Sequence, residues 1–118
     1  MGYYHDTVLT LTAATNTMLM TALKVASTEN NKLFAEAVST QTTDPTTKAT
    51  LYHWDYYQWD EAEIEFVNSF LETIDEEQFR YIRLGESYGD VDAWGELEEP
   101  FDPRVDAKLV YNKSLVNE

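Results

Sequence analysis

The stretch from Lys48 to Trp59 constrains the fold more than any other part of the chain. It holds three tyrosines, two tryptophans and a leucine within twelve positions, and these residue types prefer strands. The preceding residues 44–47, Asp-Pro-Thr-Thr, have the composition of a tight turn. We therefore predict a hairpin whose first strand covers Lys32 to Thr43. A short helix is the alternative for that first segment, and the strand is favoured because another strand follows the turn.

Alternation along the aromatic strand predicts which side chains share a face of the sheet. A regular strand carries Tyr52, Trp54 and Tyr56 on one face, and His53, Asp55, Tyr57 and Trp59 on the other. We expect one face to pack under helices. Exposed Tyr and Trp on the other face would be good anchors for a protein interface. Packing of both sets inside the protein is the alternative.

Hydrophobic periodicity and turn signals predict the remaining elements. We expect a strand at Tyr3–Thr12, a helix at Ala13–Ser27 capped by Thr12, an acidic helix from Asp60 to about Ile74, a strand at Gln78–Gly85, a loop to Pro103 and a strand at Val105–Leu115. This order predicts a single α+β domain over residues 1–118. Its antiparallel sheet would carry two helices on one face, in the ferredoxin-like βαββαβ arrangement with an extra C-terminal strand.

Negative charge is concentrated in one part of the chain. There are 22 acidic and 8 basic residues, a net charge of −14. Sixteen acids lie between Asp55 and Asp102, opposed only by Arg80 and Arg83, which we expect to bridge neighbouring carboxylates. Such a field repels phosphates, which argues against direct binding of nucleic acid or a membrane. Solubility alone is the simpler explanation, but it would favour both signs interspersed.

The concentrated charge indicates a surface that binds a basic protein. Carboxylates at i, i+4 on a helix have Cβ atoms about 5–6 Å apart, and each DNA strand carries one phosphate per roughly 3.4 Å of axis. Carboxylates on a helix and its flanking loops can therefore approximate a row of phosphates. The expected partner-binding residues are Asp60, Glu61, Glu65, Glu72, Asp75, Glu76, Glu86, Asp90, Asp92 and Glu96, with Trp59 and Trp94 as aromatic anchors.

In size, charge, absence of cysteine and the acidic stretches 60–65 and 89–96, the chain resembles the small acidic DNA-mimic inhibitors of phages and mobile elements. These include anti-CRISPR and anti-restriction proteins, which share no motif, so no functional residue is carried over. The resemblance implies an inhibitor that blocks the nucleic-acid channel of a CRISPR effector or restriction enzyme. The alternative is an interaction module or phage accessory subunit that binds through an aromatic or sheet-edge surface, with charge serving solubility. The sequence leaves open whether the chain forms a homodimer.

No motif indicates catalysis, a metal or a cofactor. The chain lacks cysteine, and the spacing of its two histidines, His5 and His53, does not support a zinc site. Residues 90–95 resemble the start of a calcium loop, but Phe101 stands twelfth, where Glu is required. Neither a phosphate-binding glycine loop nor a nucleophile elbow occurs. We expect no enzyme activity. Because the first residues lack the basic region of a signal peptide, we expect the cytoplasm of a host bacterial cell.

Overall fold

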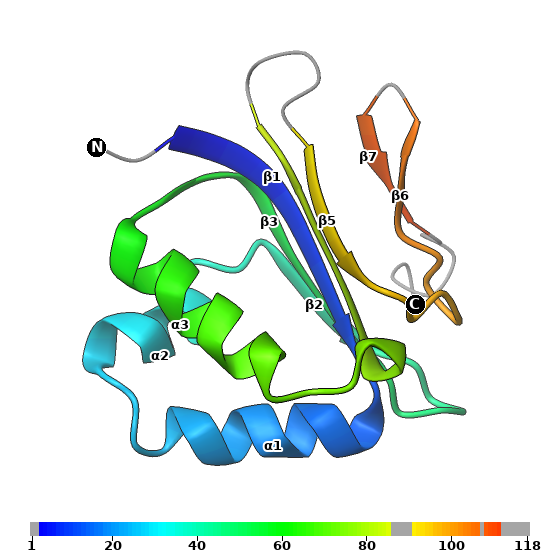
Figure 1. Cartoon of the computed structure of the whole chain (residues 1–118), viewed down its shortest axis with the longest axis horizontal. Coiled ribbons are helices and arrows are strands. Elements are labelled where there is room, and N and C mark those ends of the chain that lie inside the picture. Colours follow the sequence, from blue (N-terminus) through cyan, green and yellow to red (C-terminus); the bar gives the residue numbers. More distant parts are fainter. Residues whose placement is uncertain (1–2, 86–90, 107, 112–118) are drawn as a thin grey trace.

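The computed structural model describes residues 3–85, 91–106 and 108–111. They form three layers: helices, a five-stranded sheet, and a small hairpin on the opposite face of the sheet (Figure 1). The elements are β1 (Tyr3–Leu11), α1 (Ala13–Leu23), α2 (Thr28–Ala35), β2 (Thr40–Thr43), β3 (Thr50–Trp59), α3 (Glu61–Glu72), the 3₁₀ turn η1 (Glu76–Gln78), β4 (Phe79–Leu84), β5 (Val91–Gly95), β6 (Arg104–Asp106) and β7 (Lys108–Val110).

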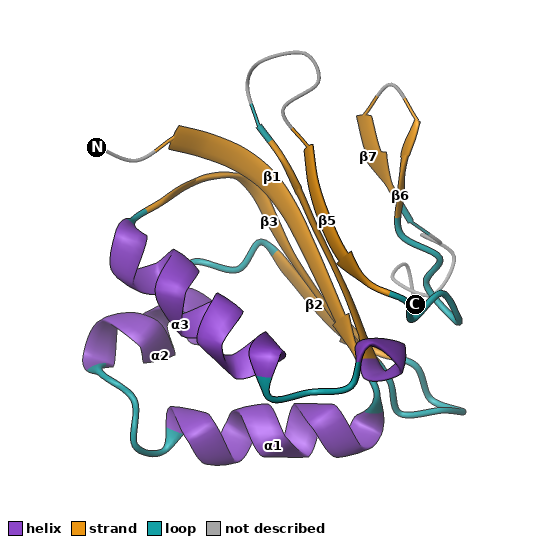
Figure 2. Ribbon diagram, viewed as in Figure 1, coloured by secondary structure: helices purple, strands orange, loops and turns teal. Residues whose placement is uncertain are grey.

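The main sheet is antiparallel and has the strand order β2-β3-β1-β4-β5. All three helices lie on one face of it (Figure 2). The predicted α+β class, the antiparallel sheet and its one-sided helical cover are confirmed. The element order differs from a simple βαββαβ chain, because a second helix, α2, precedes β2 and a fifth strand, β5, follows β4.

The polar run that begins at Ser27 starts a helix, whereas we expected it only to end one. The Ser27 side chain accepts a hydrogen bond from the Asn30 backbone N–H at 3.2 Å and so caps α2. Leu33 and Phe34 of α2 are buried against the sheet. The strand predicted from Lys32 to Thr43 is therefore wrong in its first half, and only β2 remains of it.

The segment predicted as a loop from Gly85 to Pro103 contains a strand, β5. It pairs with β4, so that Arg83 lies opposite Asp92 and Arg80 opposite Gly95. Gly95 has φ +93°, and a Cβ there would lie 2.2 Å from the Phe79 carbonyl oxygen. Only glycine can close the strand in this way, so Gly95 marks the end of a strand and not a loop.

The prediction of one last strand at Val105–Leu115 is wrong: the range holds parts of two short antiparallel strands, β6 and β7, which pair as a hairpin. This hairpin is a separate two-stranded sheet. The end of the prediction, beyond Tyr111, lies outside the described residues. Leu109 of β7 packs against Val8 and Ile82 on the sheet face that the helices leave uncovered. That face of the sheet is therefore largely buried, and not the solvated face that the sequence left open.

A β-bulge in β3 changes the faces of the aromatic side chains. Thr7 pairs with Trp54 but His5 pairs with Tyr57, so Asp55 and Tyr56 together oppose Asp6. The extra residue, Tyr56, has φ +53° and reverses the alternation after it. The helix-side core consequently contains Tyr52 and Trp54 before the bulge, and Tyr57 and Trp59 after it. The predicted division of these side chains between the faces is wrong beyond Asp55.

We expect Trp59→Ala to lower the free energy of unfolding by about 3–5 kcal/mol. The indole is 1% exposed, and its Nε1–H donates to Thr7 Oγ1 at 3.1 Å. Urea unfolding followed by circular dichroism measures the loss. Val25→Ala is the control, because Val25 is 90% exposed and its replacement should change stability by less than about 0.5 kcal/mol. Equal losses in both variants would contradict the burial of Trp59.

Candidate functional site

The described acidic residues that we expected to bind a partner lie on or next to three neighbouring segments: α3, the η1 turn and β5. We call this set the acidic surface. Its described members are Asp60, Glu61, Glu65, Glu72, Asp75, Glu76, Asp92 and Glu96, all of which are exposed. Two further residues that we expected to bind a partner, Glu86 and Asp90, lie outside the described residues.

The structure brings one half of the acidic surface close together. Glu72 of α3 and Asp92 of β5 line the same groove, which has a volume of about 450 Å³. The backbone N–H of Glu96 donates to the carbonyl oxygen of Glu76 at 2.7 Å. The C-terminal end of α3, the η1 turn and β5 therefore form one acidic region. Asp60 lies at the other end of α3, whose twelve residues span about 18 Å.

Few cations oppose this surface in the described part of the chain. Arg83 Nη2 lies 3.4 Å from Asp92 Oδ2, as expected for a bridge between the two strands. Arg80 Nη1 donates instead to the Gly95 carbonyl oxygen at 2.6 Å, so its predicted pairing with a carboxylate is wrong within the described residues. Neither Glu65 nor Glu72 forms an ion pair there. Most of the surface charge is thus exposed to solvent without a basic neighbour.

Two acids at the start of α3 are used by the fold itself. Asp60 Oδ1 accepts from the Glu63 backbone N–H at 2.8 Å, and Glu63 Oε1 accepts from the Asp60 backbone N–H at 3.0 Å. This is a capping box. Glu63 is buried and its Oε2 also accepts from the Tyr57 hydroxyl at 2.6 Å. Burial, followed by this hydrogen bond to Glu63, raises the pKa of Tyr57, so the phenol retains the proton that it donates.

The two tryptophans expected to contact a partner differ in accessibility. Trp59 is buried in the helix-side core, so it cannot touch a partner and its predicted role is wrong. Trp94 is only partly buried and lies edge-on to Phe79, with ring centroids 5.3 Å apart. It lines the groove that also contains Glu72 and Asp92. Trp94 is therefore the one of the two that a partner can reach.

A second groove, of about 550 Å³, lies between α1 and α3. Met18 of α1 and Phe66 and Phe70 of α3 line it, and Met18 is 48% exposed. By helical spacing, Met18 and Ala22 share one stripe of α1. The structure instead buries Leu19 and Leu23, the stripe beside it. The exposed Met18 side chain thus forms part of an apolar groove next to α3.

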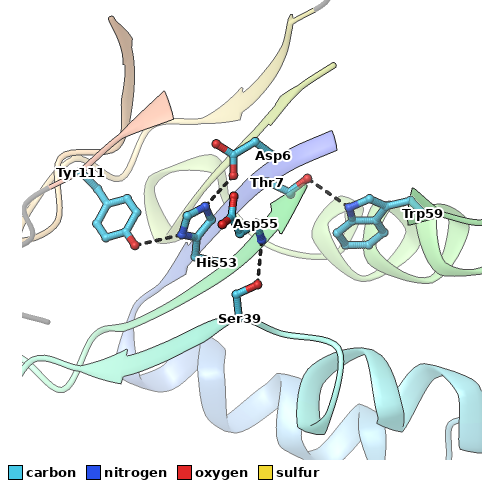
Figure 3. A network of polar contacts seen from close by, with 7 residues as sticks. All are labelled: Asp6, Thr7, Ser39, His53, Asp55, Trp59 and Tyr111. Atoms are coloured by element: carbon cyan, nitrogen blue, oxygen red, sulfur yellow. Dashed lines mark hydrogen bonds and ion pairs between the residues drawn. The ribbon is translucent and has the colours of Figure 1, made fainter. Parts of the chain in front are cut away.

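A polar cluster occupies the sheet face opposite the helices, beside the bulge (Figure 3). His53 Nε2 lies 2.6 Å from Asp6 Oδ1, and a hydrogen bond of 2.9 Å joins His53 Nδ1 to the Tyr111 hydroxyl. The Asp55 carboxylate faces the same pair, and its backbone N–H donates to Ser39 Oγ at 2.9 Å. Burial raises the pKa of Tyr111, so this hydroxyl is protonated at neutral pH.

The sequence did not predict this cluster. It gave the spacing of His53 and Asp55, two residues apart on one strand, and that spacing alone places them on one face. Asp6 joins them only because β1 pairs with β3 in a particular register. The missing signal was therefore the pairing of two segments separated by more than forty residues.

No protein-family model, no curated protein and no solved structure matches the chain. Among the described residues, no helix is both long enough and apolar enough to cross a membrane.

Replacing an acid that caps a helix should lower the free energy of unfolding, whereas replacing an acid with no such contact should not. Asp60→Ala removes a cap and is expected to lower the free energy of unfolding by about 1 kcal/mol. Glu72→Gln should leave stability unchanged or raise it by about 0.3 kcal/mol, because Glu72 ends α3, where negative charge is unfavourable. Urea unfolding at low salt compares the two variants. A loss in Glu72→Gln as large as that in Asp60→Ala would contradict this assignment.

Proposed function

We propose that the protein inhibits another protein by placing its acidic surface on that protein's basic nucleic-acid-binding surface. The supporting observation is the exposure of eight carboxylates on α3, η1 and β5, with one ion pair, Arg83–Asp92, among the described members. The proposed partner is a CRISPR effector or restriction enzyme in the bacterial cytoplasm. On this proposal the protein is not an enzyme.

Physical chemistry favours a basic macromolecule as the partner. Like charges at helical spacing, such as Glu61 and Glu65, repel one another by a few tenths of a kcal/mol. A partner's lysines and arginines relieve that repulsion when they bind. Attraction between two such surfaces also speeds association and weakens steeply with salt. The acids of α3 are presented by a helix fixed by its capping box, so their spacing is set before binding.

We also propose that β1, α1, β2, β3, α3 and β4 are a ferredoxin-like unit to which α2 and β5 are added. The antiparallel neighbours β2-β3-β1-β4 support this. Such a fold serves many functions, so the functional proposal depends on the acidic surface alone.

Reversing charges within the acidic surface should abolish binding. The test variant combines Glu65→Lys with Asp75→Lys. The matched control combines Glu29→Lys with Glu36→Lys. It makes the same charge change at two exposed positions, one in α2 and one directly after it. Each protein is produced in bacteria that carry a CRISPR or restriction system, and phage plating efficiency is measured. Wild type and control should raise plating, and the test variant should not.

Capture of the partner by the same variants tests the proposed mechanism directly. The proteins are used to capture partners from the same cells at 0.1 M salt and at 1 M salt, where the Debye length falls from about 10 Å to about 3 Å. Wild type and control should retain the partner only at low salt, and the test variant at neither. Equal capture by the test variant and the control would overturn the proposal.

The apolar groove between α1 and α3 supports a second candidate, an interaction module. Ser69 of α3 lines the groove. Glu65 lies four residues before Ser69 and Glu72 three residues after it, so both lie next to Ser69 on the helix surface. By this spacing, acids lie along the α3 side of an apolar floor. The complementary occupant is a partner's amphipathic helix with an apolar face and basic edges.

Met18→Ser distinguishes the two candidates. Met18 is 48% exposed on the groove, so the change should leave the fold intact. If the protein is an interaction module, Met18→Ser should lower partner capture at least tenfold, at low and high salt alike. The acidic-surface mechanism requires capture to stay within twofold of wild type. Capture assays at the two salt concentrations decide between them.

A further inference from the structure

We propose that Asp6, His53 and Asp55 bind a divalent transition-metal ion such as Zn²⁺. One nitrogen and two carboxylate oxygens, one from each residue, lie within 4.8 Å of one another. The three residues come from the two central strands, β1 and β3, on the face opposite the helices (Figure 3). The site is therefore held by the most extensively paired part of the sheet, and it shares no residue with the acidic surface.

The distances fit an ion after small side-chain movements. Bonds of about 2.0–2.2 Å from zinc to nitrogen or oxygen put neighbouring donor atoms about 3.4 Å apart in a tetrahedron. Asp6 Oδ1 now lies 2.6 Å from His53 Nε2, so it must withdraw by about 0.8 Å. A carboxylate only accepts hydrogen bonds, so Nε2 carries the proton in the ion-free protein. The ion takes the place of that proton.

Tyr111 orients the imidazole for this role. Its hydroxyl is 2.9 Å from His53 Nδ1, and the two rings meet edge-on with centroids 5.3 Å apart. Histidine ligands of metals characteristically use the second ring nitrogen in such a hydrogen bond. The hydroxyl can donate to Nδ1 in the ion-free protein. When Nε2 binds the ion, Nδ1 carries the proton and donates a hydrogen bond to the hydroxyl oxygen.

The bulge supplies the third ligand. Asp55 and Tyr56 together lie opposite Asp6, which brings the Asp55 carboxylate beside that of Asp6. The hydrogen bond from the Asp55 backbone to Ser39 Oγ fixes the strand at this point. Bulges of this kind recur next to functional sites, where they redirect a side chain.

Charge in the cluster also favours a cation. Two carboxylates lie side by side, and within the described ranges neither Asp6 nor Asp55 forms an ion pair with a lysine or arginine. The site borders the apolar cluster that includes Val8 and Leu51, against which Tyr111 packs. Charges interact more strongly at such a boundary than in water. A divalent cation offsets this repulsion better than His53 can.

The ligand set indicates the class of metal. Calcium and magnesium are bound by oxygen ligands, whereas imidazole suits zinc, copper, iron and nickel. Three protein ligands leave a fourth tetrahedral position for water or for a group from another molecule. His53 and Asp6 retain 15% and 23% exposure of their side chains, and Asp55 is exposed. The site is therefore partly buried but accessible to an ion from solvent.

Titration of the whole chain with zinc chloride tests the site. Calorimetry should show one tight equivalent, and NMR should show the His53 ring signals shifting while those of His5, the other histidine, stay within a line width. Calcium chloride at the same concentration should leave both rings unshifted. Asp55→Asn and His53→Gln should each weaken zinc binding at least tenfold. Asp92→Asn, the same charge change in the acidic surface, should not.

Two results would overturn the proposal. One is a His53 ring that stays unshifted at saturating zinc. The other is an Asp92→Asn protein that loses as much affinity as Asp55→Asn, because zinc would then be binding to dispersed carboxylates. Circular dichroism confirms that each variant is folded. Asp55 is exposed, so Asp55→Asn keeps the test decisive if His53→Gln does not fold.

Discussion

The pairing of β1 with β3 is the constraint on which the rest of the structure depends. It is interrupted by one extra residue, Tyr56, at the bulge. That residue returns Tyr57 and Trp59 to the helix side, where they complete an aromatic core with Trp54. The same interruption leaves Asp55 on the opposite face beside Asp6. One backbone irregularity thus determines both what fills the core and what polar groups meet outside it.

The aromatic core limits how this protein can bind anything else. The sequence left the aromatic strand open as either core or interface, and the structure uses Tyr52, Trp54 and Trp59 to hold α2 and α3 on the sheet. Trp54 also donates to the Leu33 carbonyl oxygen at 2.8 Å, which anchors α2 directly. Trp94 in one groove and Met18 in the other are large side chains that stay accessible near the acids.

Sequence reasoning succeeded where the signal is local. The start of α3 follows from the acidic first turn that begins at Asp60, and the β2–β3 turn from Asp44, whose Oδ2 accepts from the Thr47 backbone at 2.7 Å. It failed where two local interpretations compete or where register decides. Ser27 can follow one helix or cap the next, and β5 is short and ends at a glycine. The grouping of Asp6 with His53 requires the register of two distant strands, which no local pattern contains.

The acidic surface and the cluster at the bulge differ in burial, and burial decides what each can attract. Exposed acids such as Glu65 and Asp75 are screened by water and salt, so each contributes little alone. Many together attract a large basic surface over a long range. Asp6 and Asp55 are few, convergent and next to an apolar cluster, where a single small cation gains most. The distribution of like charge in this fold thus favours a macromolecule on the α3–β5 side and an ion at the bulge.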